Sequence, residues 1–302
     1  AVSVWGGEDG SFDTSTGVSS TPEYGKVFIS VKSTTSLNLT TSQKENLVKD
    51  LSPFKVASIT PVIVDPETTF IILGITFNFN STATTQSKTD LETSVTDAIS
   101  NFTDSNLEDF NLPFRHSLVT GLIDDVDSAI TNNTTTVTLG KFFKPSLTTS
   151  TNYTVSFNNA LYNPHSGHNS GGGGVIASTG FQIDGDTSTE YFFDEDGSGN
   201  LRTYSIVSGT RTYLNSTAGS VDYANGIITI NALKITAVSN IDGEISSSIR
   251  VTAIPSSNDV IPVRNQILEI DLVNTTITGQ VDNTATTGVG YTTSSTGTTT
   301  TT

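Results

Sequence analysis

The loop at residues 194–200, Asp-Glu-Asp-Gly-Ser-Gly-Asn, holds the densest group of oxygen ligands in the chain. Oxygen ligands at alternate positions suit Ca²⁺, and the spacing places Gly199 at the sixth position of a calcium-binding EF-hand loop. The twelfth position is Ser205, where such a loop needs a bidentate Glu, and no flanking helices are predicted. Asp and Gly are also ordinary hairpin-turn residues. We therefore expect a turn, and a calcium site is the alternative.

The histidines offer two further candidates for chemistry. His165 and His168 are three residues apart in a Gly-rich loop, a spacing at which two imidazoles can take part in binding zinc, but no third ligand is indicated. His116, Ser117 and Asp124 have the residue types of a nucleophilic triad. Ser117 lacks a nucleophile-elbow motif, and adjacent His and Ser side chains on a helix point in different directions. We assign no catalytic, cofactor-binding or metal-binding residue, and expect a protein that is not an enzyme and needs no cofactor.

Two other features indicate contacts rather than chemistry. Arg115 lies near the start of a predicted helix at residues 114–123, and it could reach the acidic group Asp124, Asp125 and Asp127 at the helix end. We expect a structural ion pair there, between Arg115 and Asp124. An N-terminal strand-like arm carries Val2, Val4 and Trp5, an apolar set that must be buried against something. This set either docks on its own domain or inserts into a partner subunit, since aromatic anchors often dominate interfaces.

The elements expected in residues 22–148 form one α+β domain in the order β-α-β-β-α-α-β. Residues 26–32 alternate as a half-buried strand does. Thr40 and Gln43 have the spacing of a capping box at the start of a short helix. A strand at residues 56–64 carries Pro61, which indicates an edge position or a bulge. A strand at residues 69–80 is expected to pair back on it as a hairpin.

The helical half of this domain follows. Leu91, Val95, Ile99 and Phe102 are spaced as one face of a long helix. A second helix is expected around residues 114–123, and a closing strand at 134–144. This order is typical of a split βαβ-type sheet with its helices on one face.

The rest of the chain is predicted to form β strands and connecting segments. Many short alternating segments with turn residues between them predict an all-β sandwich or barrel-like domain at residues 149–281. The predicted strands are 153–157, 174–182, 190–193, 201–208, 226–237, 246–254 and 266–272. Residues 1–21 are interpreted as an arm and linker, and the Thr-rich residues 282–302 as a flexible tail.

Composition limits the classes of partner. The 302 residues include 14 Lys and Arg against 30 Asp and Glu, a formal net charge of −16. Such a chain is repelled by DNA phosphates and anionic membrane surfaces, so we expect neither nucleic acid nor a membrane as a partner. The absence of Cys excludes disulfides and thiolate metal sites. The chain has no Met, even at position 1, so either processing removed a leader or the chain is part of a longer product.

Three segments carry a resemblance to a known family. They are Tyr-Gly-Lys-Val-Phe-Ile-Ser-Val-Lys at 24–32, Ala-Ser-Ile-Thr-Pro-Val-Ile-Val-Asp-Pro-Glu at 57–67 and Phe-Arg-His-Ser-Leu-Val-Thr-Gly-Leu-Ile-Asp-Asp-Val-Asp at 114–127. In order and spacing they resemble the C-terminal half of the baseplate wedge family of T-even-like contractile-tailed phages, within the baseplate J-like proteins. The similarity runs from about residue 4 to about residue 162, and it consists of fold motifs rather than site motifs.

The resemblance implies a structural virion protein of the tail baseplate, assembled in the cytoplasm of the bacterial host. Its implied partners are a second copy of itself and other wedge and hub proteins, without nucleic acid, membrane or small-molecule substrate. It would help to link wedges into the hexagonal ring that triggers sheath contraction when the tail fibres bind a host. The alternative is a secreted or surface-exposed β-rich adhesin or surface-layer fragment, which predicts Ig-like modules throughout. A tail-associated glycan hydrolase is a third reading, and it requires paired carboxylates in a cleft.

Overall fold

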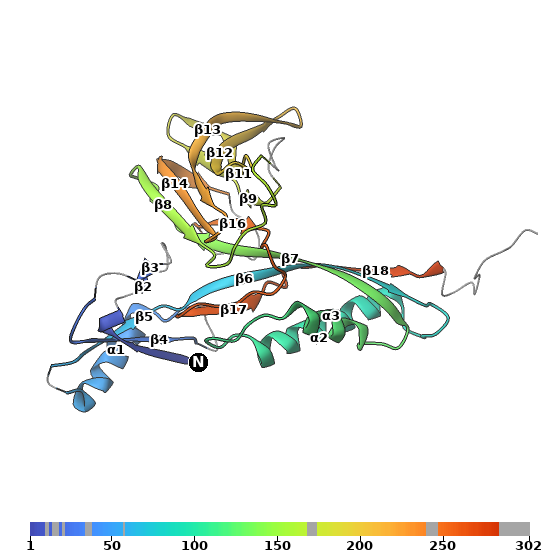
Figure 1. The fold of residues 1–302 in the computed structure, drawn as a ribbon, viewed down its shortest axis with the longest axis horizontal. Helices are drawn as coiled ribbons and strands as arrows, with labels where there is room; N and C mark the ends of the chain where they lie inside the picture. Colours follow the sequence, from blue (N-terminus) through green and yellow to red (C-terminus); the bar gives the residue numbers. More distant parts are fainter. Residues whose placement is uncertain are drawn as a thin grey trace, which may run out of the picture.

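The computed structural model describes a long, flat base with a separate β lobe standing on it (Figure 1). Helices lie on the opposite side of the base from this lobe. No helix in the described part of the chain is both long and apolar enough to cross a membrane. His168 and the tail from residue 284 onward lie outside the described residues, which are 1–9, 12–13, 18–19, 22–33, 38–56, 58–167, 174–239 and 247–283.

One end of the base is the N-terminal unit, a three-stranded sheet with one helix. Its strands are β1 (Val2–Gly6), β4 (Lys26–Val31) and β5 (Thr60–Val64), in the order β1-β4-β5. Helix α1 (Thr41–Leu51) connects the parallel strands β4 and β5. Its capping box is confirmed, because the Gln43 N–H donates to Thr40 Oγ1 and the Thr40 N–H donates to Gln43 Oε1. Pro61 lies on the edge strand β5, as predicted.

Short elements complete this unit. They are the two-stranded pair β2 (Phe12–Asp13) and β3 (Val18–Ser19) and the 3-10 turns η1 (Gly7–Asp9) and η2 (Ser52–Phe54).

The centre of the base is a second sheet built on the long strand β6 (Glu67–Phe79). Strand β7 (Ile130–Phe143) pairs antiparallel with one edge of β6. Strands β17 (Gln266–Ile270) and β18 (Thr276–Val281) pair parallel with successive halves of its other edge. Strands β16 (Ile249–Ala253) and β9 (Ile176–Ser178) extend the sheet beyond β7.

The predicted hairpin between β5 and β6 is wrong, because these strands belong to different sheets. Only Asp65 and Pro66 separate them. A two-residue hairpin needs residues that adopt positive φ, whereas proline is held near −65°. The chain therefore continues past Pro66 into a new sheet, where the Glu67 N–H donates to the Asn265 carbonyl.

Two helices cover one side of this sheet (Figure 1). The first, α2 (Lys88–Asn106), buries the predicted stripe of Leu91, Val95, Ile99 and Phe102. These side chains belong to the same core as the alternate apolar residues of β6. The second is α3 (His116–Asp124), which buries Val119 and Ile123.

The distal lobe is a seven-stranded antiparallel sheet in the order β15-β10-β11-β12-β13-β14-β8. Its strands are β8 (Thr151–Ser156), β10 (Phe181–Ile183), β11 (Asp186–Glu195), β12 (Asn200–Val207), β13 (Thr210–Asp222), β14 (Ile227–Leu233) and β15 (Ile235–Val238). The predicted class, α+β followed by an all-β sandwich or barrel-like part, is confirmed. Residues 249–281, predicted to lie in the β-rich domain, instead complete the base sheet through β16, β17 and β18.

Candidate interface and contact sites

The Asp194 loop is a hairpin between β11 and β12 whose carboxylates are occupied by protein donors. Asp194 is buried, and its carboxylate accepts hydrogen bonds from Arg202 Nε at 3.0 Å, Arg211 Nη1 at 2.8 Å and Tyr213 Oη at 3.0 Å. Burial and the Asp194 charge raise the pKa of the Tyr213 phenol. The two guanidinium groups stack on Tyr213 and Tyr204, so the charged cluster is also packed.

The next two acids of this loop are equally engaged. Glu195 Oε1 accepts from the backbone N–H groups of Gly174 and Val175, both at 3.0 Å. Asp196 Oδ1 accepts from the N–H groups of Ser198 and Asn200, which closes the turn. Among the described residues no group of three or more His, Cys, Asp or Glu side chains is arranged to hold a metal ion. The geometry is that of the turn rather than of a calcium loop.

The predicted ion pair between Arg115 and Asp124 is wrong in its partner. Arg115 precedes the nine-residue helix α3 and Asp124 ends it, which separates them by about 13 Å along the axis. Arg115 Nη1 pairs with Asp259 at 2.9 Å, and the other oxygen of Asp259 accepts from the His116 N–H. These hydrogen bonds lower the pKa of Asp259. Asp259 therefore caps α3 from a segment far away in the sequence.

The residue types of the triad do not form a relay. His116 Nε2 lies 2.9 Å from the carbonyl oxygen of Thr135. Asp124 Oδ1 accepts from Asn133 Nδ2 at 2.8 Å. His165 is exposed, with Nδ1 3.2 Å from the Ser166 carbonyl oxygen.

The N-terminal apolar set divides between the two faces of β1. Trp5 is buried and stacks on Phe28 of β4, with ring centroids 5.7 Å apart. Trp5 therefore docks on its own domain. Val2 and Val4 are on the opposite face, because side chains alternate along a strand, and they are 61% and 59% exposed.

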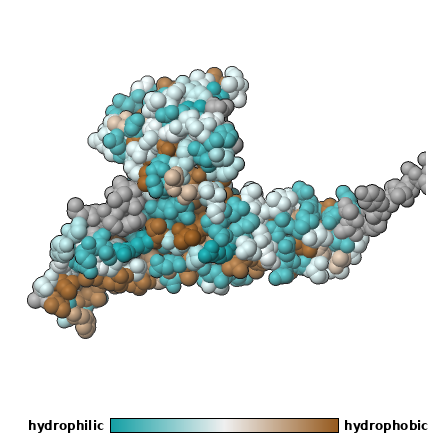
Figure 2. Space-filling view, viewed as in Figure 1, coloured by the Kyte–Doolittle hydropathy of each residue, from teal (hydrophilic) through white to brown (hydrophobic). Residues whose placement is uncertain are grey.

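Further exposed apolar residues lie on the same N-terminal unit. Tyr24, Phe54 and Val56 are 81%, 85% and 65% exposed. Figure 2 shows apolar surface gathered over this end of the base. We use the name N-terminal apolar surface for the large apolar side chains of this unit that are more than half exposed, which are Val2, Val4, Tyr24, Phe54 and Val56. Apolar patches of this kind typically mark contact sites, and this one is the strongest candidate interface of the N-terminal unit.

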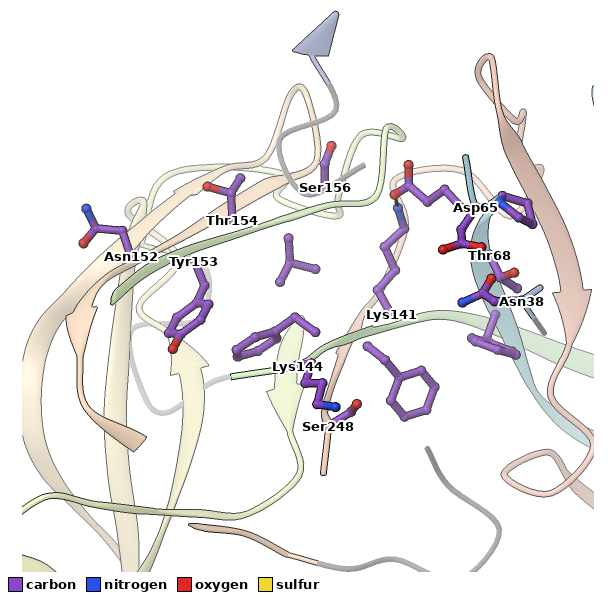
Figure 3. A pocket seen from close by; sticks show the side chains of 16 residues that line it. Asn38, Asp65, Thr68, Lys141, Lys144, Asn152, Tyr153, Thr154, Ser156 and Ser248 are labelled. Atoms are coloured by element: carbon purple, nitrogen blue, oxygen red, sulfur yellow. Dashed lines mark ion pairs between the residues drawn. The ribbon is translucent and has the colours of Figure 1, made fainter. Parts of the chain in front are cut away.

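A cleft of about 670 Å³ is lined by residues of β6 and β7 in the base and of β8 in the distal lobe. Lys141 of β7 and Glu67 of β6 form a buried ion pair in its wall (Figure 3). Burial lowers the pKa of Lys141 to about 7. Asp65 also lines the cleft and pairs with Lys44 at 2.6 Å. Glu67 and Asp65 each form an ion pair with a lysine. This arrangement differs from that of a glycan hydrolase, in which one carboxyl group acts as the general acid and the other as the general base or nucleophile.

In the described part of the chain, these acidic and imidazole groups hold elements together, and apolar surface remains exposed on the N-terminal unit. The comparisons with known proteins assign this chain to the class of structural proteins. Residues 1–64 match the family model "Baseplate structural protein gp6, C-terminal domain I", and residues 67–141 match "Baseplate structural protein gp6, C-terminal domain III". The chain therefore carries the C-terminal region of a baseplate wedge protein, a structural component of the phage tail baseplate.

A curated relative supports the same assignment. Baseplate wedge protein gp6 of Enterobacteria phage T4 is 29% identical over 113 residues, which cover 37% of this chain and 17% of that protein. The break between the two matched domains falls at Asp65 and Pro66, where the chain passes from the N-terminal unit to the base sheet. Residues 142–302, which include the distal lobe, lie outside both matched domains.

Proposed function

We propose that this chain is a non-enzymatic subunit that links baseplate wedges into the hexagonal ring of a contractile phage tail. Its partners are a second copy of itself and other wedge and hub proteins. The observation that carries this proposal is the N-terminal apolar surface, which lies entirely within the matched C-terminal domain I.

The size of this surface suits a contact that forms within an assembly. Full burial of one large apolar side chain contributes roughly 1.5–3 kcal/mol. Five such side chains, partly buried already, contribute roughly 5–10 kcal/mol by the same scale. Association costs about 4–15 kcal/mol in lost freedom. A contact of this size therefore has low affinity between isolated chains. Its affinity is higher within a ring that holds neighbouring chains close together, because tethering raises the effective concentration.

This balance supports a mechanical role. Symmetry-related contacts of moderate strength hold one ring geometry and yield to another when neighbouring proteins move. The alternative of a β-rich adhesin is less well supported, since it predicts Ig-like modules throughout, whereas the base carries α2 and α3 packed on a mixed sheet. The net charge of −16 disfavours nucleic acid and anionic membranes as partners.

The test is self-association measured by sedimentation velocity over a concentration series that extends to high protein concentration, because the contact is weak in the isolated chain. Val4→Lys places a charge on the exposed face of β1, within the N-terminal apolar surface, and we expect it to abolish association while leaving thermal unfolding unchanged. The matched control is Val207→Lys, a valine 54% exposed on the distal lobe, which we expect to associate as the unmodified chain does. Equal association of all three proteins would contradict the proposal for this surface.

A further inference from the structure

One pair of side chains in the base combines opposite charge with deep burial. Lys141 of β7 and Glu67 of β6 form an ion pair, and their side chains are only 5% and 8% exposed. Strands β6 and β7 are antiparallel neighbours, and Ile71 pairs with Leu139. Continuing this register by two residues places Lys141 opposite Thr69 and diagonally across from Glu67, on the face that carries the core. The central strands of the sheet therefore hold the two side chains together.

Neither charged group has the hydrogen bonds that a buried ion pair needs. In the described part of the chain, Lys141 Nζ and Glu67 Oε2 are buried and have no hydrogen-bond partner beyond this contact. A buried ion pair offsets its lost hydration only where further hydrogen bonds satisfy the remaining polar atoms. Burial accordingly lowers the pKa of Lys141 to about 7, so much of this amine is uncharged at neutral pH. A lysine desolvated in this way is an activated nucleophile.

The atoms that would react are already close together. Lys141 Nζ touches Glu67 Oε1, and this oxygen is bonded directly to the carboxyl carbon Cδ (Figure 3). Both backbones are also fixed, because Lys141 pairs with Val251 of β16 and the Glu67 N–H donates to the Asn265 carbonyl. Fixed proximity of a nucleophile and its target removes much of the entropic barrier to their reaction.

We propose that Lys141 and Glu67 condense to an intramolecular amide (isopeptide) bond that joins β7 to β6. Transfer of one proton from the ammonium to the carboxylate gives an uncharged amine and a carboxylic acid. The amine nitrogen Nζ attacks Cδ, the Nζ–Cδ bond forms, and one Cδ–O bond breaks. The departing hydroxyl takes a proton from the amine and leaves as water, so no oxidant, reductant or further reactant is needed. The product is uncharged, which removes both buried charges and their desolvation cost.

The surroundings of the pair suit such a bond. Glu67 and Lys141 both line the cleft, which gives the released water a path out of the site. They are also the first and last residues matched to C-terminal domain III, so the bond ties the ends of that domain together. The chain has no Cys to form a disulfide, and an amide is not broken by the reducing conditions of a cytoplasm. The bond requires only these two side chains and does not depend on the proposed function.

The test is the intact mass of the purified chain, measured by mass spectrometry under denaturing conditions. We expect a mass lower than that of the sequence by one water molecule. Tandem mass spectrometry of a digest should locate this loss in a branched fragment that joins Glu67 to Lys141, and trypsin should not cut after Lys141. The internal control is Lys44, whose pair with Asp65 is partly exposed and should remain ionic, so trypsin should cut after Lys44.

Two variants assign the lost water. Lys141→Met has no amine at this position, and we expect it to have the full mass of its sequence. Lys44→Met is the matched control and should still lack one water. The fragment map of the unmodified chain decides the question even where a variant fails to fold.

Two outcomes would overturn the proposal. An unmodified chain with the full mass of its sequence would show that Lys141 and Glu67 remain an ion pair. A missing water that persists in Lys141→Met would show that the loss arises elsewhere, because ring closure at an Asp-Gly pair removes the same mass.

Discussion

Replacement of Asp194 separates the two interpretations of the 194–200 loop. Asp194 is 1% exposed, and it neutralises Arg202, which is nearly as deeply buried. In Asp194→Ala the Arg202 guanidinium loses its carboxylate and keeps a hydrogen bond to the Glu195 carbonyl. The variant therefore leaves a buried, uncompensated charge in the distal lobe.

The expected cost follows from the burial of each partner. Removing one member of a buried ion pair destabilises a protein by about 3–5 kcal/mol. The contact to Arg211 adds less than about 1 kcal/mol, because that side chain is 40% exposed. At roughly 2–4 °C per kcal/mol, the thermal midpoint should fall by about 6–20 °C.

The assay is thermal unfolding with and without Ca²⁺, with Asp196→Ala as the matched control from the same loop. Asp196 caps only the local turn, so its loss should cost about 1 kcal/mol. We expect neither Ca²⁺ nor a chelator to change the midpoint of the unmodified chain. The reasoning is refuted if Ca²⁺ raises that midpoint and both substitutions abolish the rise, because a calcium loop depends on both carboxylates.

Three further measurements test the structure. Trp5→Ala removes the ring stacked on Phe28 and should lower the unfolding free energy by about 3–5 kcal/mol in a denaturant titration, whereas an unchanged value would show that Trp5 is not packed there. Lys141 has a pKa of about 7 in the folded chain and a higher one unfolded, so the unfolded state binds more protons between pH 7 and about 10.4. In chain that keeps the ion pair with Glu67, stability relative to Lys141→Met should therefore rise across that window, and a flat difference would contradict the burial of Lys141. Asp259→Ala removes the cap of α3 and should cost about 1–2 kcal/mol by thermal unfolding, a loss that an exposed, unpaired Asp259 would not produce.

Local patterns predicted the elements that local interactions determine. The capping box at Thr40 and the buried stripe of α2 were both expected, because each depends on residues within a few turns of one helix. The placement of β5 and β6 in different sheets was not predicted. The Asp65-Pro66 pair already indicated it, because proline cannot make the turn that a tight hairpin requires. The pairing of β17 and β18 with β6 joins segments about two hundred residues apart, which periodicity cannot reveal.

The contact residues likewise include some that the sequence could predict and some that only the tertiary fold reveals. Alternation along β1 already implies that Trp5 and Val4 face opposite sides, so the sequence contained the evidence that they do not share one surface. The partner of Arg115 could not be predicted, because Asp259 reaches α3 through tertiary folding alone.

The central claim is that this chain is part of the baseplate of a contractile tail. Immunogold electron microscopy of tailed particles and host cells, with an antibody raised against the chain, tests it most directly. We predict label confined to the end plate of the tail, distal to the sheath. Label on the cell envelope with none on the particles would contradict this account and favour the adhesin.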